Sequence, residues 1–135
     1  LRDEQLTDFY HYTVFPNFAV SVTADGFHFL RSRPHATGPE RCVFDNWFYA
    51  IDPPDGATRV FTPGGAAPAG VDAEHEIFDY MEKSLGYGMD QDMSITSGQQ
   101  LGFRSRGFKG VYLSGQEARV RRYHEVLDEY IDGKR

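Results

Sequence analysis

The chain has 135 residues, of which 40% are apolar and 25% are charged, and this composition is typical of one folded domain. Fourteen basic and twenty acidic residues give a net charge of −6, which argues against nucleic acid or an anionic membrane as a partner. The single cysteine, Cys42, excludes an internal disulfide and an iron–sulfur cluster held by two thiolates of this chain. No apolar run is long enough to span a membrane, and residues 1–6 lack the apolar core of a signal peptide, so we expect a cytoplasmic protein.

The first half of the chain is rich in residues that favour strands. Residues 10–23 carry β-branched and aromatic side chains around a Pro-Asn interruption, which predicts two short strands or one kinked strand. The turn signal Ala-Asp-Gly at 24–26 predicts a hairpin leading into a strand over 27–33. Residues 41–51 predict a further strand that is apolar on both faces, as in a central strand covered by a helix or a strand that lines a pocket.

The second half of the chain predicts a long loop followed by helices. Residues 52–70 are rich in proline and glycine and predict the loop, interrupted by one short strand over 59–62. Asp72 is the expected N-cap of a helix over 73–85, and a second, weaker helix is expected from Asp90 or Asp92 to about residue 101. Ser114 and Glu117 form the signature of a capping box, after which an apolar stripe predicts a long last helix, ended by Gly133: Val120, Tyr123, Leu127, Tyr130 and Ile131.

Strands that precede helices predict an α+β fold. We expect an antiparallel sheet with the long C-terminal helix laid against it.

Two groups of residues are candidates for chemistry. The five histidines lie at positions 11, 28, 35, 75 and 124, and none forms the close pair with which a helix or turn holds a metal, so structural or solvated roles are favoured. Asp90 and Asp92 flank Gln91 near the start of a predicted helix, where capping and first-turn carboxylates are the ordinary explanation. The surrounding segment 86–107 nevertheless holds many small polar residues that pack poorly, which is typical of a site.

Three segments together resemble a known enzyme family. They are YHYTVFPNF at 10–18, RSRPHATGPERCVFDNW at 31–47 and DMSITSGQQLGFRSRG at 92–107, in which Gln100 follows Asp92 by eight positions. The final helix, SGQEARVRRYHEVLDEYI at 114–131, fits the same pattern. The chain thus resembles the C-terminal part of the catalytic domain in the large (α) subunit of Rieske-type aromatic ring-hydroxylating oxygenases, over nearly its whole length.

The resemblance implies a fold and a chemistry. The fold is half of a helix-grip (START-like) domain, with antiparallel strands curved around the C-terminal helix. The chemistry is dioxygen activation at mononuclear non-haem Fe(II) held by two histidines and a carboxylate, and Asp92 takes the carboxylate position. Electrons come from a Rieske 2Fe-2S cluster elsewhere in the subunit, which is served by a ferredoxin or reductase. The implied substrate is aromatic or apolar, and the parent protein is expected to be a homo-oligomer.

The sequence also departs from the family pattern. The family's paired-histidine motif and its Cys-His cluster motifs precede the matched segments, and neither occurs in this chain. We therefore expect residues 1–135 to be the C-terminal portion of a longer catalytic domain, inactive by itself. The alternative is a non-catalytic helix-grip module that binds an apolar ligand without metal. Aromatic residues that suit a flat ring, although each also suits an ordinary core, are Phe27, Phe29, Phe44, Trp47, Phe48 and Phe78.

Overall fold

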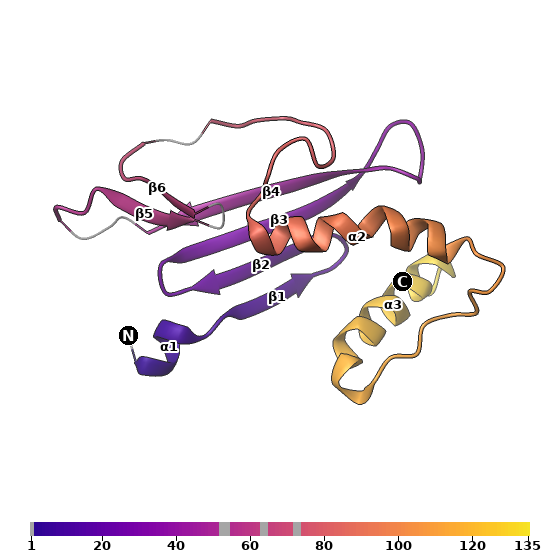
Figure 1. The fold of residues 1–135 in the computed structure, drawn as a ribbon. Helices are drawn as coiled ribbons and strands as arrows, with labels where there is room; N and C mark the ends of the chain where they lie inside the picture. Colours follow the sequence, from indigo (N-terminus) through magenta and orange to yellow (C-terminus); the bar gives the residue numbers. More distant parts are fainter. Residues whose placement is uncertain (1, 52–54, 63–64, 72–73) are drawn as a thin grey trace.

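Four consecutive strands form an antiparallel sheet at the centre of the computed structural model, which describes residues 2–51, 55–62, 65–71 and 74–135 (Figure 1). The strands keep their sequence order in space: β1 (Tyr10–Val14), β2 (Phe18–Thr23), β3 (Gly26–Pro34) and β4 (Cys42–Ala50). The other elements are α1 (Asp3–Thr7), β5 (Arg59–Thr62), β6 (Gly65–Pro68), α2 (Tyr87–Phe103), the short 3-10 helix η1 (Gly115–Glu117) and α3 (Ala118–Ile131). The predicted α+β class, with an antiparallel sheet and a C-terminal helix, is confirmed and is consistent with a helix-grip arrangement.

The two tight connections in the sheet follow from their residues. The Pro-Asn interruption lies in the turn between β1 and β2, where Asn17 donates from Nδ2 to the Ser32 carbonyl oxygen at 2.8 Å. Residues 24 and 25 connect β2 to β3, and Thr23 donates from its hydroxyl to the Asp25 carboxylate at 2.7 Å. Gly26 then passes so close to β4 that a Cβ would overlap the Tyr49 carbonyl oxygen, so only glycine fits there.

The strand register sorts the side chains into two faces, because neighbouring side chains along a strand alternate. The helix-side face carries the cross-strand rows His11, Ser21, His28, Phe48 and Thr13, Ala19, Leu30, Asn46. The open face carries the rows Tyr10, Val22, Phe27, Tyr49; Tyr12, Val20, Phe29, Trp47; and Val14, Phe18, Arg31, Asp45. Both faces of β4 carry apolar side chains, as expected for the strand over 41–51.

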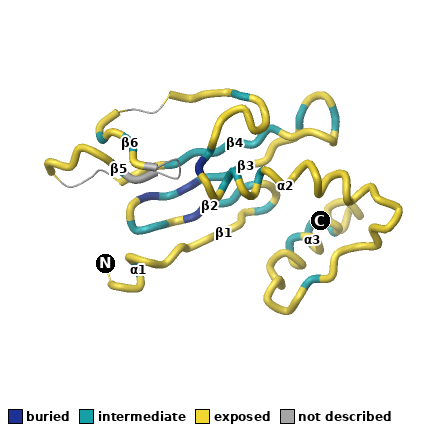
Figure 2. Tube along the Cα trace, viewed as in Figure 1, coloured by how far each residue is buried: buried dark blue, intermediate teal, exposed yellow. Residues whose placement is uncertain are grey.

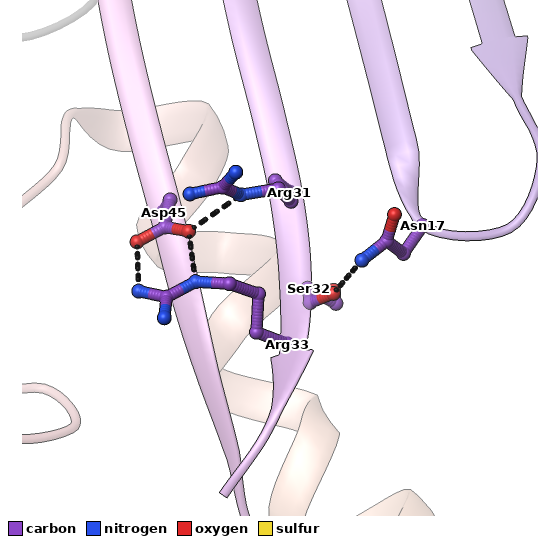
Figure 3. Close-up of polar contacts among 5 residues, drawn as sticks. All are labelled: Asn17, Arg31, Ser32, Arg33 and Asp45. Carbon is purple, nitrogen blue, oxygen red and sulfur yellow. Dashed lines mark hydrogen bonds and ion pairs between the residues drawn. The ribbon is translucent and has the colours of Figure 1, made fainter.

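Both long helices lie on one side of the sheet. Helix α2 crosses in front of the strands in Figure 1, and Figure 3, which views the opposite face, shows helical ribbon behind them. Helix α3 meets the sheet at the β1–β2 turn, where the Tyr123 hydroxyl donates to the Pro16 carbonyl oxygen at 2.5 Å. The Phe15 ring lies 5.5 Å from the Tyr123 ring and 5.3 Å from the Tyr130 ring, measured between centroids. None of the helices in the described parts of the chain combines the length and apolarity that a membrane crossing requires.

The helix expected over 73–85 is wrong, because residues 74–79 and 84–86 are irregular and residues 80–83 form a turn and a bend. Its expected cap, Asp72, and Ala73 lie outside the described residues. Local hydrogen bonds replace the helix: the Asp79 N–H donates to the Glu82 carboxylate at 2.8 Å, and the Glu82 N–H donates to the Asp79 carbonyl at 2.9 Å. Ile77, which belongs to the predicted apolar stripe, is 90% exposed, so no packing stabilises a helix there.

Two further elements differ from expectation. Helix α2 begins at Tyr87, before Asp90, and continues to Phe103 through Gly88 and Gly98. The short strand expected over 59–62 is confirmed as β5, and it pairs antiparallel with β6, which the sequence analysis did not predict.

The chain has little closed core. Among the described residues no apolar side chain is fully buried, and the chain exposes 11156 Å² (Figure 2). A compact monomer of 15.3 kDa exposes about 7,100 Å² according to the usual scaling with mass. The apolar stripe of α3 is likewise not buried in a core, since Val120, Tyr130 and Ile131 are exposed. Apolar surface of this extent is typical of surfaces that other protein segments cover.

We expect Tyr123 to attach α3 to the sheet. Replacing Tyr123 with Phe removes one hydrogen bond, about 1 kcal/mol, and Tyr123→Ala also removes the contact with Phe15. Amide hydrogen exchange in α3 should therefore be faster in the Tyr123→Phe variant than in the wild type, and faster still in Tyr123→Ala. Tyr112→Ala is the control, because Tyr112 is 98% exposed. Equal exchange in Tyr123→Ala and the wild type would show that α3 is held by other contacts.

Candidate functional site

Asp92 lies in the second turn of α2, on the side of the helix that faces away from the preceding segment. Its carboxylate is exposed, and the hydrogen bonds found in the described parts of the chain leave it without a partner. At about 100° per residue, Asp92 points about 160° away from Asp90 around the helix axis. An exposed carboxylate on a regular helix is available as a ligand at a fixed position.

Asp90 is engaged in local structure. Its carboxylate accepts the Ser84 hydroxyl at 2.5 Å and the Leu85 N–H at 2.8 Å. These hydrogen bonds, that from Ser84 first, hold the pKa of Asp90 below its usual value. The two aspartates that the sequence places side by side therefore have different environments.

The histidines are distributed over the fold and do not meet. His11 and His28 share a row on the helix-side face, where His11 Nδ1 is hydrogen bonded to Ser21 Oγ at 2.5 Å and His28 Nε2 is bonded to Asn46 Oδ1. His35 is bonded to Thr37 in the β3–β4 loop, while His75 and His124 are exposed. Within the described ranges, no three His, Cys, Asp or Glu side chains lie close enough to hold a metal ion.

An ion-pair cluster that the sequence analysis missed lies on the open face (Figure 3). Asp45 accepts from Arg33 Nε at 2.6 Å and Nη2 at 2.8 Å, and from Arg31 Nε at 2.9 Å. Arg31 also lies over the Trp47 ring, with its Cζ 5.1 Å from the ring centroid. The Arg33 hydrogen bonds, followed by those of Arg31, lower the pKa of Asp45 to about 2, although partial burial opposes the shift. The sequence signal for this cluster is the two-residue spacing of Arg31 and Arg33, which puts both side chains on the same face of β3. Asp45 lies opposite Arg31 on the neighbouring strand, β4.

The aromatic residues considered for substrate contact do not share one cavity. Phe44 borders an open hollow of about 320 Å³ on the helix-side face, together with Leu30 and the Tyr123 ring from α3. Phe27, Phe29 and Trp47 lie on the opposite face. The register of the strands therefore puts these aromatic residues on two different faces of the sheet, which the composition of the sequence does not reveal.

One protein-family model matches almost the whole chain. The sequence model of the family described as "Ring hydroxylating alpha subunit (catalytic domain)" matches residues 1–133. The chain belongs to this family. Searches of curated proteins and of solved structures gave no match. Membership in the ring-hydroxylating α-subunit family supports a role in an oxygenase, as part of the full subunit, and agrees with the resemblance carried by residues 10–18, 31–47 and 92–107.

We expect the Asp45 cluster to make stability depend on acid pH. The pKa of Asp45 is about 2 in the folded protein against an ordinary value of 3.8, so folding favours the ionised form. Its stabilising contribution is complete above about pH 4 and is lost as the pH falls from about 4 towards 2. Urea unfolding followed over this range should show a steeper acid loss in the wild type than in Asp45→Asn. Parallel pH profiles for the two proteins would contradict this assignment.

Proposed function

We propose that this chain is the C-terminal portion of a ring-hydroxylating oxygenase catalytic domain, and that Asp92 is the carboxylate ligand of its mononuclear iron. The family match over residues 1–133 carries the proposal. Two structural observations support it: the exposed Asp92 carboxylate has no hydrogen-bond partner within the described ranges, and the sheet leaves much apolar surface for other segments of a larger domain to cover.

The donor set fits this role only in part. A 2-His-1-carboxylate site needs three protein ligands, and the described residues bring no three His, Cys, Asp or Glu side chains together at Asp92. The two histidines would come from the upstream part of the parent polypeptide. When bound, Fe(II) supplies dioxygen activation, with electrons from a Rieske 2Fe-2S cluster elsewhere in the subunit and, before that, from a ferredoxin or reductase.

The residues of this chain have two tasks in such a subunit. Asp92 supplies negative charge at a rigid helical position, so that the metal is held without rearrangement of the backbone. The hollow bordered by Leu30, Phe44 and Tyr123 offers mostly apolar surface to an aromatic or related apolar substrate. The parent protein is proposed to be a homo-oligomer of such subunits.

Loss of the ligand is the direct test. In the full-length subunit, Asp92→Ala should abolish hydroxylation and remove most mononuclear iron, because a site that loses one of three protein ligands binds the metal weakly. Iron content per subunit measures this, and the visible spectrum of the Rieske cluster should stay unchanged.

The neighbouring aspartate, Asp90, gives a comparison variant. Asp90→Ala should retain more iron than Asp92→Ala. If Asp90→Ala removes the iron while Asp92→Ala keeps it, the ligand assignment is wrong. If neither variant nor the wild type contains iron beyond the cluster, the protein is instead a metal-free helix-grip module that binds an apolar ligand.

The 135-residue chain alone should hold neither metal group. It has one thiol and no close histidine pair, so we expect no visible absorption from an iron–sulfur cluster and no iron retained after desalting. Stoichiometric iron in the purified 135-residue chain would contradict the proposal that the two histidine ligands lie upstream of this chain.

A further inference from the structure

We propose that Asp90 is a positioning residue, which ties the start of α2 to the segment before it and thereby fixes the place of Asp92. The proposal rests on the proposed function in one respect, that Asp92 is a metal ligand. It assigns to Asp90 no contact with metal or substrate, and its basis is a set of hydrogen bonds around the first turn of α2.

The Asp90 carboxylate bonds backwards along the chain. One oxygen accepts the Leu85 N–H at 2.8 Å, and the other accepts the Ser84 hydroxyl at 2.5 Å. The Ser84 hydroxyl oxygen in turn accepts the Gly86 N–H at 3.2 Å. Three consecutive residues before the helix are therefore connected to a side chain in its first turn.

The start of α2 has no side-chain N-cap. Gly86 occupies the cap position with φ 97° and has no side chain to accept the first helical N–H groups. Its backbone conformation is one that other residues avoid, and Gly86 is buried. The Asp90 carboxylate accepts hydrogen bonds from the segment before the helix, and it thereby attaches the helix start to Ser84 and Leu85.

A second contact of the same segment lies one turn further along. The Tyr80 hydroxyl donates to the Met93 carbonyl oxygen at 2.5 Å, and Thr96 Oγ1 lies 3.5 Å from the Tyr80 oxygen. Residues 80–86 therefore hold α2 at Asp90 and at Met93, on either side of Asp92 in the sequence. Both contacts engage one side of the helix and leave the Asp92 side free.

The consequence is a carboxylate with restricted motion and open access. Rotation or fraying of the first turns of α2 would displace Asp92, and the two attachments at Asp90 and Met93 oppose such movement. Metal ligands depend on neighbours of this kind, and their loss typically reduces metal affinity about 10- to 100-fold.

The test measures iron affinity in the full-length subunit, by competition with a ferrous chelator. Asp90→Ala should weaken iron binding about 10- to 100-fold. Asp90→Asn should restore most of the affinity, because the amide oxygen still accepts the Leu85 N–H and the amide N–H can donate to the Ser84 hydroxyl oxygen. Ser84→Ala, which removes one of the two bonds, should give an intermediate loss. Asp128→Ala, an exposed acidic residue on α3, is the control and should change nothing.

Hydrogen exchange gives a readout without metal. In the metal-free subunit, amides of residues 87–93 should exchange faster in Asp90→Ala than in Asp90→Asn or the wild type. A purely structural role would lower the melting temperature while iron affinity stayed at the wild-type value, and that result would overturn the proposal. Retention of iron by Asp92→Ala would instead overturn the ligand assignment, so the two failures are distinguishable. Loss of iron in Asp90→Asn as in Asp90→Ala would make Asp90 itself a ligand and would also refute positioning.

Discussion

Backbone pairing across β1 to β4 is the interaction on which the remaining structure depends. Strands β3 and β4 pair along their whole length, from Gly26 opposite Ala50 to Pro34 opposite Cys42. No apolar side chain in the described ranges is fully buried, so the ladder is not supported by a closed core. Cross-strand aromatic contacts add to it, such as Phe27 with Tyr49 at 4.8 Å between ring centroids. Helix α1 and strand β5 contact this sheet, and Tyr123 attaches α3 to its β1–β2 turn.

The two faces of the sheet have different chemical characters. On the open face, aromatic rows end in the cluster of Arg31, Arg33 and Asp45, in which the Asp45 side chain is only 10% exposed. On the helix-side face, polar pairs such as Ser21 with His11 satisfy each other beside the apolar hollow at Tyr123. The apolar hollow therefore lies beside α3, while the open face combines apolar area with positive charge.

The proposed metal ligand depends on a different and local set of interactions. Helix α2 has few good helix formers and no buried residue, so its own packing does little to hold Asp92 in place. Hydrogen bonds from residues 80–86 supply that constraint at Asp90 and Met93. With its start attached and little packed against it, α2 can hold the Asp92 carboxylate in a fixed place and leave space beside it.

Sequence patterns by themselves determined the strands, their turns, the last helix and the family, because alternation, the turn residues at 24–26 and the Ser114–Glu117 capping signature are local features. They also singled out Asp90 and Asp92. Only the tertiary structure decided that the two carboxylates differ, since Asp90 is bonded to Ser84 and Leu85. It also showed that helical spacing over 73–85 does not form a helix, because an apolar stripe stabilises a helix only where something covers it, and Ile77 is exposed. The pairing of Asp45 with two arginines likewise depends on register between strands, which no local pattern specifies.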